Sequence, residues 1–176
     1  SGHKIHGPKG AGALYISPRL KSFPALLQGG GQEGGLRSGT EGTPAIFGFA
    51  AAAGAGAKTL RQDSAREKEL IAYLADKLSA LPGVVINGAH EAPHILSIAI
   101  PGVPTQNSIN IPQDAGICVS AGAACAKGHR SHVLSAMEVP GAVIDAAFRV
   151  SLCRDTTKAE LDALVQVITR DILPRI

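Results

Sequence analysis

Aromatic and charged residues are scarce in this chain. Only 3% of its 176 residues are aromatic, none is tryptophan, and 18% are charged, with a formal net charge of +3. Proteins that bind nucleic acid rely on aromatic stacking surfaces and on dense clusters of lysine or arginine. The composition therefore argues against nucleic acid as a partner.

Long apolar runs are also missing, and cysteines are few. No hydrophobic stretch reaches the roughly 18 residues of a membrane span, and the glycine-rich start lacks the apolar core of a signal peptide. The three cysteines are an odd number without the spacing of a disulfide framework. We expect no membrane association and a reducing compartment, by default the cytoplasm.

Small and hydrophobic residues are abundant instead. Hydrophobic residues make up 45% of the chain and glycine accounts for 21 positions, which is enough for a real core with tight turns. Residues 1–60 carry segments too apolar to be self-contained. Residues 61–176 alternate short strand-like and helical patterns, which predicts a compact α+β domain with a mostly antiparallel sheet.

The first part predicts three elements. Residues 10–17 have the pattern of a short buried strand. Residues 27–40 are so rich in glycine that we expect an ordered loop only if a ligand binds it. Thr43 is a predicted N-cap with Pro44 at the first helical position, and the small, apolar body of this helix predicts burial on all sides.

The second part contains two capping-box motifs, each of which predicts the start of a helix. Ser64 to Glu67 and Thr157 to Glu160 each place a hydroxyl three residues before a glutamate, ahead of apolar residues at helical spacing. Cys118 and Cys153, in or next to apolar strands, are expected to be packing residues. The remaining predicted elements are strands at 84–87, 95–100, 117–120 and 148–152 and a helix at about 131–137.

Lys4 lies in a glycine-rich stretch near the start. Residues 1–15 read S-G-H-K-I-H-G-P-K-G-A-G-A-L-Y, which places an amine capable of forming a Schiff base beside hydroxyl and imidazole groups. The glycines would let the backbone approach a ligand. A solvated lysine is the other interpretation, whereas a Walker A loop is disfavoured by Pro8 and by the missing Ser/Thr after the lysine.

Cys125 lies in a second small-residue cluster, S-A-G-A-A-C-A-K-G at 120–128. Nearby cations favour the thiolate form of an accessible cysteine, although a lone cysteine is more often a packing residue. Zinc binding by Cys125, His129 and His132 is an alternative. Because that set holds only three candidate ligands, we expect no metal.

Arg149 interrupts an otherwise apolar strand pattern, F-R-V-S-L. Its planar guanidinium offers the two parallel donors that a carboxylate accepts. A salt bridge at an edge or interface is the alternative, and Arg154 is a second candidate for carboxylate binding.

Together these motifs resemble the pyridoxal-phosphate-dependent cysteine desulfurases. The family pattern S-x-H-K-x-x-G-P-K-G-x-G-x-L-Y is matched at 1–15, and G-G-G-Q-E-x-G-x-R-S-G-T is matched at 29–40. The thiol loop at 120–125 is similar to the family's S-S-G-S-A-C. Gly34 stands where an arginine is common in the family, and the loop after the thiol is slightly shorter.

The resemblance implies a role for each of these residues. Lys4 would hold pyridoxal 5'-phosphate and transfer protons, Cys125 would carry the persulfide, and Arg149 would bind the substrate carboxylate. The residues implied to bind the cofactor phosphate are Ser1, His3 and, across the interface of a homodimer, Thr40.

The resemblance also implies a fold, the α/β PLP-dependent transferase fold type I. Residues 1–60 would form the end of the large PLP-binding domain, with the Schiff-base lysine and the interface loop. Residues 61–176 would form the small C-terminal α+β domain that carries the thiol loop. The implied reaction converts L-cysteine to L-alanine and passes sulfur through Cys125 to an iron-sulfur scaffold or another sulfur acceptor protein.

Part of the family pattern has no counterpart here. The N-terminal half of the enzyme, with an aspartate for the pyridinium nitrogen and a histidine stacked on the ring, is not found in the sequence, so we expect the chain alone to be inactive or nearly so. A selenocysteine lyase or aminotransferase-like enzyme is an alternative that would not need Cys125. A non-catalytic interaction fragment is another.

Overall fold

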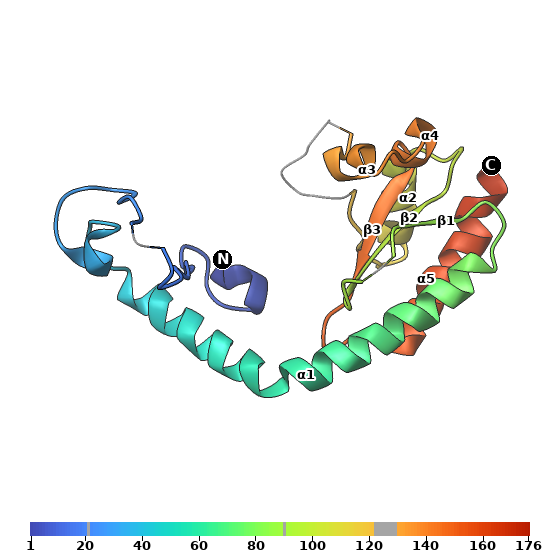
Figure 1. The fold of residues 1–176 in the computed structure, drawn as a ribbon. Helices are drawn as coiled ribbons and strands as arrows, with labels where there is room; N and C mark the ends of the chain where they lie inside the picture. Colours follow the sequence, from blue (N-terminus) through green and yellow to red (C-terminus); the bar gives the residue numbers. More distant parts are fainter. Residues whose placement is uncertain (21, 90, 122–129) are drawn as a thin grey trace. The chain divides into compact units, whose positions relative to one another are not determined.

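The described residues form two compact units that one helix connects. The computed structural model describes residues 1–20, 22–89, 91–121 and 130–176. These divide into the units Ser1–Leu60 and Arg61–Ile176 (Figure 1). Within those ranges, no helix combines the length and the apolar character that crossing a membrane requires.

The first unit contains two short 3₁₀ helices and the first part of a long helix. These are η1 (Gly2–Ile5), η2 (Gln32–Gly35) and α1 (Thr43–Ser79). The strand predicted at residues 10–17 is not formed, and Leu14 and Tyr15 are 70% and 82% exposed. A strand needs a neighbouring backbone to complete its hydrogen bonds, and no strand of the described residues lies beside this segment.

The helix α1 is continuous, where the sequence predicted two helices. Its first bonds reach the Gly42 carbonyl, which accepts from the amides of Ala45 and Ile46 at 3.0 and 3.1 Å. The predicted N-cap Thr43 is therefore already inside the helix. Ser64 lies in the helix interior rather than at a second start, because the alanine-rich turns before it continue the helix without a break.

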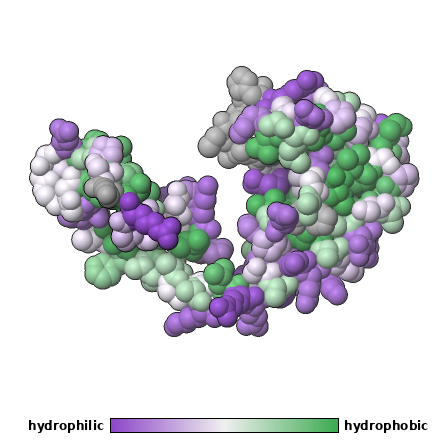
Figure 2. All heavy atoms as spheres, in the orientation of Figure 1, coloured by the Kyte–Doolittle hydropathy of each residue, from purple (hydrophilic) through white to green (hydrophobic). Residues whose placement is uncertain are grey.

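The two parts of α1 differ in burial. Its buried residues all lie after residue 60 and are Leu70, Ile71, Leu74, Ala75 and Leu78. The apolar segment that begins at Thr43 was predicted to be buried on all sides, but it has no buried residue and Phe47 is 75% exposed. That prediction was wrong for this chain, since the first unit places too few side chains over the helix to cover it. Figure 2 shows apolar surface on both units.

The second unit is built on a three-stranded antiparallel sheet. Its strands are β1 (Val85–Asn87), β2 (Ile95–Ala99) and β3 (Ala147–Ser151), with β2 in the middle. Three of the four predicted strands are confirmed to within one or two residues. The fourth, at 117–120, is not a strand and makes only a single antiparallel bridge, from Ser120 to Arg149.

One face of this sheet carries the main core. Side chains alternate across a strand, so Leu96 and Ile98 of β2 and Phe148 and Val150 of β3 point to the same side. They pack against the buried residues of α1 and of the last helix. A smaller apolar cluster includes one end of the opposite face and consists of Ala99, Leu134, Ile144, Ala146 and Ala147.

In the described part of the sequence between β2 and β3 there are three helices. They are α2 (Thr105–Asp114), α3 (His132–Ala136) and α4 (Gly141–Ile144). The predicted helix near residue 131 is confirmed as α3, and the Ser131 hydroxyl caps it by accepting from the Leu134 amide at 3.3 Å. The helices α2 and α4 were not predicted, because both are short and carry no capping box.

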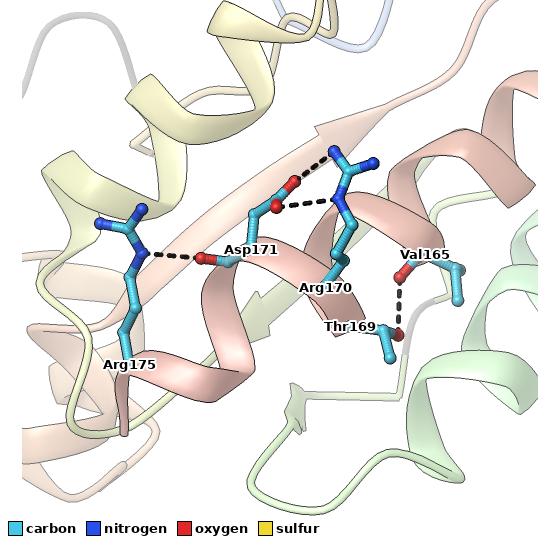
Figure 3. Close-up of polar contacts among 5 residues, drawn as sticks. All are labelled: Val165, Thr169, Arg170, Asp171 and Arg175. Carbon is cyan, nitrogen blue, oxygen red and sulfur yellow. Dashed lines mark hydrogen bonds and ion pairs between the residues drawn. The ribbon is translucent and has the colours of Figure 1, made fainter.

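The chain ends in α5 (Lys158–Val167), continued by η3 (Ile168–Ile172) and η4 (Leu173–Arg175). The predicted capping box of Thr157 and Glu160 is present. Figure 3 shows the contacts that hold the last turns. The Thr169 hydroxyl donates to the Val165 carbonyl at 2.8 Å, Arg170 pairs with Asp171, and Arg175 Nε donates to the Asp171 carbonyl at 2.7 Å.

Candidate functional site

Lys4 lies on the short helix η1 with its side chain exposed to solvent. Ser1 and His3 are exposed on the same turn. A 3₁₀ helix repeats every three residues, so Ser1 and Lys4 lie on the same side of it, and the Lys4 amide donates to the Ser1 carbonyl at 3.2 Å. The turn thus presents an amine, a hydroxyl and an imidazole together.

Glycines fix this turn to α1. A Cβ atom added at Gly2 would lie 3.1 Å from Phe49 Cδ2, and one added at Gly48 would lie 2.9 Å from Pro8 Cγ. The Gly2 amide also donates to the Ala11 carbonyl at 2.7 Å. These glycines therefore allow close approach to the protein's own helix, where the sequence suggested approach to a ligand.

The glycine-rich loop from Gly29 to Thr40 is ordered by its own hydrogen bonds. The Ser38 hydroxyl donates to the Gly30 carbonyl at 2.7 Å, and the Gly39 amide donates to Gln32 Oε1 at 3.2 Å. The expectation that only a ligand would order this loop was wrong, because hydrogen bonds to the side chains of Ser38 and Gln32 hold its backbone. Thr40 is exposed at the end of the loop.

The donors of the first unit suit a phosphorylated aldehyde cofactor. The hydroxyls of Ser1 and Thr40 and the imidazole of His3 are all exposed and can donate to phosphate oxygens. The Lys4 amine is exposed as well, so it is free to react with a carbonyl carbon. By the chemistry of this donor set, the residues present fit pyridoxal 5'-phosphate.

Arg149 is half-buried in β3 of the second unit. Its Nε donates to the Ser151 hydroxyl at 3.1 Å, and its backbone exchanges two hydrogen bonds with Ser120, at 2.6 and 3.1 Å. Within the described ranges Arg149 takes part in no ion pair, so the salt-bridge alternative finds no partner there. The two terminal nitrogens of the guanidinium are the groups left for an anion.

A row of polar side chains crosses the sheet at Arg149. Asn87 of β1 lies opposite Ser97 of β2, and Ser97 lies opposite Arg149 of β3. Asn87 is only 8% exposed, and its Nδ2 donates to Ser97 Oγ at 3.3 Å. The sequence reasoning missed Asn87 and Ser97. The signal was there, since each is the one polar residue in an otherwise apolar predicted strand.

Arg154, the second candidate for carboxylate binding, follows β3 in an exposed turn. Its carbonyl accepts from Arg66 Nη1 of α1 at 2.6 Å, and the Thr156 carbonyl accepts from Nη2 of the same arginine. Arg66 therefore fixes the backbone of this turn. Nothing in these contacts brings the Arg154 side chain into the polar row.

Cys125, the predicted nucleophile, lies outside the described residues, as does His129 of the zinc alternative. No group of metal ligands is found in the ranges the structure covers. Cys118 and Cys153 are free and exposed, so the prediction that both are packing residues was wrong. Ile117 and Val119 turn toward the core, which leaves Cys118 outside, and Cys153 lies in the turn after β3.

Arg130, the first described residue after position 121, is held by Asp145 at the end of α4. Arg130 Nε donates to Asp145 Oδ1 at 2.7 Å. This hydrogen bond and the nearby positive charge lower the pKa of the Asp145 carboxyl. Both side chains are more than half exposed, so the pair contributes little to stability.

The curated proteins that this chain matches include cysteine desulfurases from several bacteria. The chain is 38% identical over 172 residues to a cysteine desulfurase from Rhodobacter capsulatus and 38% identical over 173 residues to one from Nostoc, with 96% of the chain covered in both cases. It covers 44% and 43% of these two proteins, so the chain spans less than half the length of the curated relatives it matches.

Solved structures of cysteine desulfurases and NifS-like proteins are also similar to this chain. A NifS-like protein superposes with a TM-score of 0.85 at 35% identity, over all of this chain and 46% of its own. The Escherichia coli cysteine desulfurase CsdA superposes with a TM-score of 0.76 at 24% identity, over 97% of this chain and 44% of its own, which supports the fold alone. The fold is that of the matching part of a PLP-dependent transferase of fold type I.

The aminotransferase class-V family model matches residues 1–164, which include Lys4, the glycine-rich loop, Arg149 and the polar row. With more than nine-tenths of its length matched, this chain belongs to the aminotransferase class-V family of pyridoxal-phosphate-dependent enzymes.

Proposed function

We propose that this chain carries the reactive residues of a cysteine desulfurase, which converts L-cysteine to L-alanine and transfers the sulfur to a protein cysteine. The observation that supports this most directly is Lys4, whose exposed side chain lies on a turn that tight glycine contacts fix to α1. Similarity to proteins named cysteine desulfurase supports the choice of reaction.

In this proposal the first unit holds pyridoxal 5'-phosphate. Lys4 would hold the cofactor through its amine, and Ser1, His3 and Thr40 would bind the phosphate, the last in the partner subunit's site. When bound, the cofactor supplies an electron sink that makes loss of the amino acid's Cα proton feasible.

The chain's own groups then bind the substrate and move protons and sulfur. Arg149 binds the α-carboxylate with its two terminal nitrogens, because Ser151 already occupies Nε. The Lys4 amine accepts the Cα proton. The Cys125 thiolate forms a bond to the substrate sulfur as the carbon–sulfur bond breaks. The carbon takes up a proton to give L-alanine, and the persulfide on Cys125 passes its outer sulfur to an iron-sulfur scaffold or another acceptor protein.

The cofactor site is tested by reduction and mapping. The protein is incubated with pyridoxal phosphate and reduced with borohydride, and its peptides are weighed. We expect a phosphopyridoxyl group on Lys4 and none on Lys9, which is also exposed and lies five residues further on. Lys9→Ala should keep the labelling, whereas Lys4→Ala should abolish it. Equal labelling of both lysines would contradict a dedicated site.

The thiol is tested with a matched pair of cysteine variants. L-Alanine formation from L-cysteine is measured for the cofactor-loaded protein, isolated with any companion chain. Cys125→Ser should lose this activity, and Cys118→Ser, which removes a thiol that the structure shows to be free and exposed, should keep it. Full activity in Cys125→Ser would favour a selenocysteine lyase or an aminotransferase-like enzyme instead.

We further propose that the protein is a homodimer in the cytoplasm. Tyr15, Leu26 and Phe47 of the first unit are each at least 75% exposed, and a second copy would remove such apolar surface from water. The two exposed free thiols suit a reducing compartment. Sedimentation analysis should give a dimer. A dimer that binds no pyridoxal phosphate would favour the interaction fragment.

A further inference from the structure

The polar row on the sheet has a residue beside Arg149 that the proposed reaction does not yet use. Ser97 lies directly opposite Arg149 in the antiparallel register of β2 and β3. Directly opposite residues have Cβ atoms about 4.5–5.5 Å apart and share a face. Leu96 and Ile98, the neighbours of Ser97 along β2, face the core, so Ser97 and Arg149 both project from the other side.

The hydrogen bond that Ser97 already makes determines which part of its hydroxyl is left for a ligand. A serine hydroxyl has one proton to donate and two lone pairs. One lone pair of Ser97 accepts from Asn87 Nδ2 at 3.3 Å, and Asn87 is held in place by being 92% buried, the complement of its 8% exposure. Among the described residues no acceptor takes the hydroxyl proton, which leaves it for a further acceptor.

Arg149 adds further donors on the same face of the sheet. The guanidinium has only donors, and its Nε is taken by Ser151. The free hydroxyl proton of Ser97 and the terminal nitrogens of Arg149 project from adjacent strands on one face. Two neighbouring donors with a formal positive charge suit an anion with two acceptor oxygens, which is the chemistry of a carboxylate.

The choice of residue supports a binding role over a packing role. Position 97 is in the middle strand of the sheet, where β-branched and aromatic residues are favoured. Serine contributes little packing there, and Ser97 is half-buried rather than sealed in the core.

We propose that Ser97 is a second contact for the α-carboxylate of the amino-acid substrate. Its hydroxyl donates to one carboxylate oxygen while Arg149 holds the group, and Asn87 is the positioning residue that orients the hydroxyl. This inference rests on the proposed function, because it takes Arg149 as the carboxylate-binding residue.

The test compares two ligands that differ by the carboxylate. L-Alanine and ethylamine are titrated into the cofactor-loaded protein and binding is measured by calorimetry. A hydrogen bond to a charged group is stronger than one between neutral groups, and Ser97 is only half-buried, so Ser97→Ala should weaken L-alanine binding about tenfold. It should leave ethylamine binding unchanged. The KM for L-cysteine should rise by a similar factor.

Three control variants separate binding from structure. Ser97→Thr keeps the hydroxyl and should restore most of the affinity. Ser135→Ala removes a hydroxyl that donates to the carbonyl of Ser131, the N-cap of α3, and should change the binding of neither ligand. Asn87→Ala should show a smaller loss for L-alanine alone. Thermal unfolding of each variant identifies any that fails to fold.

The outcomes distinguish this inference from the proposed function. If Arg149→Ala loses discrimination between the two ligands while Ser97→Ala retains wild-type affinity for L-alanine, Ser97 is not a contact and the proposed function stands. If Arg149→Ala retains full discrimination, both are overturned. An equal loss for both ligands in Ser97→Ala would also overturn the inference, because it would indicate a structural defect.

Discussion

Replacing Gly48 by alanine tests whether α1 positions the turn that carries Lys4. The added Cβ would lie 2.9 Å from Pro8 Cγ and 3.0 Å from Pro8 Cδ. Real Cβ atoms do not approach so closely, and a proline ring cannot rotate away as a long side chain can. The turn from Gly2 to Pro8 must therefore move off the helix.

A second glycine in the same helix provides the reference. Gly54 has no atom within 4 Å of its Cβ position. Alanine is favoured over glycine in a helix by about 1 kcal/mol, and this gain applies to Gly48→Ala and Gly54→Ala alike. Overpacking costs about 1–3 kcal/mol. The stability difference between the two variants should therefore equal the overpacking cost, with Gly54→Ala the more stable.

Urea unfolding measures this difference, and borohydride labelling of Lys4 with pyridoxal phosphate measures its effect on the turn. We expect Gly48→Ala to be less stable than Gly54→Ala and to label Lys4 less efficiently. If the two variants unfold at the same urea concentration and label equally, the contact between Pro8 and Gly48 does not hold the turn, and the reasoning fails.

Three further changes test other parts of the structure. Leu74→Ala empties a fully buried core position and should lower the free energy of unfolding by about 2–5 kcal/mol; a loss under 1 kcal/mol would contradict that burial. Gly34→Ala places a side chain at φ 63° and should cost about 1–2 kcal/mol, seen as a lower urea midpoint. Hydrogen bonds from the Thr157 amide and hydroxyl lower the pKa of Glu160 below its ordinary 4.5, so their stabilisation is full above that value and is lost as the pH falls through the folded pKa. Thr157→Ala should cost about 1 kcal/mol at neutral pH and should lose less stability on acidification than the wild type; parallel pH profiles would argue against the capping box.

Local signals predicted the second unit well. The capping box at Thr157 and the apolar runs of β2 and β3 depend only on residues that are close in the sequence, so both could be predicted. The capping box at Ser64 failed because its hydroxyl competes with an alanine-rich helix that is already formed on its N-terminal side. The segment at 117–120 failed as a strand because it pairs with β3 only at Ser120.

The candidate site was predictable in part. Lys4 and Arg149 were recognisable from motif and residue type, whereas the contacts around each residue were not. The polar row could not be found without the register, because Asn87, Ser97 and Arg149 come together only when β2 pairs with both its neighbours. The apolar pattern around Leu14 and Tyr15 predicted burial, and their exposure could not be foreseen from the sequence.

The continuity of α1 has a consequence for hydrogen exchange. Helix nucleation is unfavourable and propagation is easy. The buried residues that stabilise a helix nucleus lie between Leu70 and Leu78. From there the helix extends toward Thr43 through turns that contain Gly54 and Gly56 and have no buried residue. Amide protection should therefore be greatest around Leu74 and decline toward Ala45, so that a single helix opens progressively from one end.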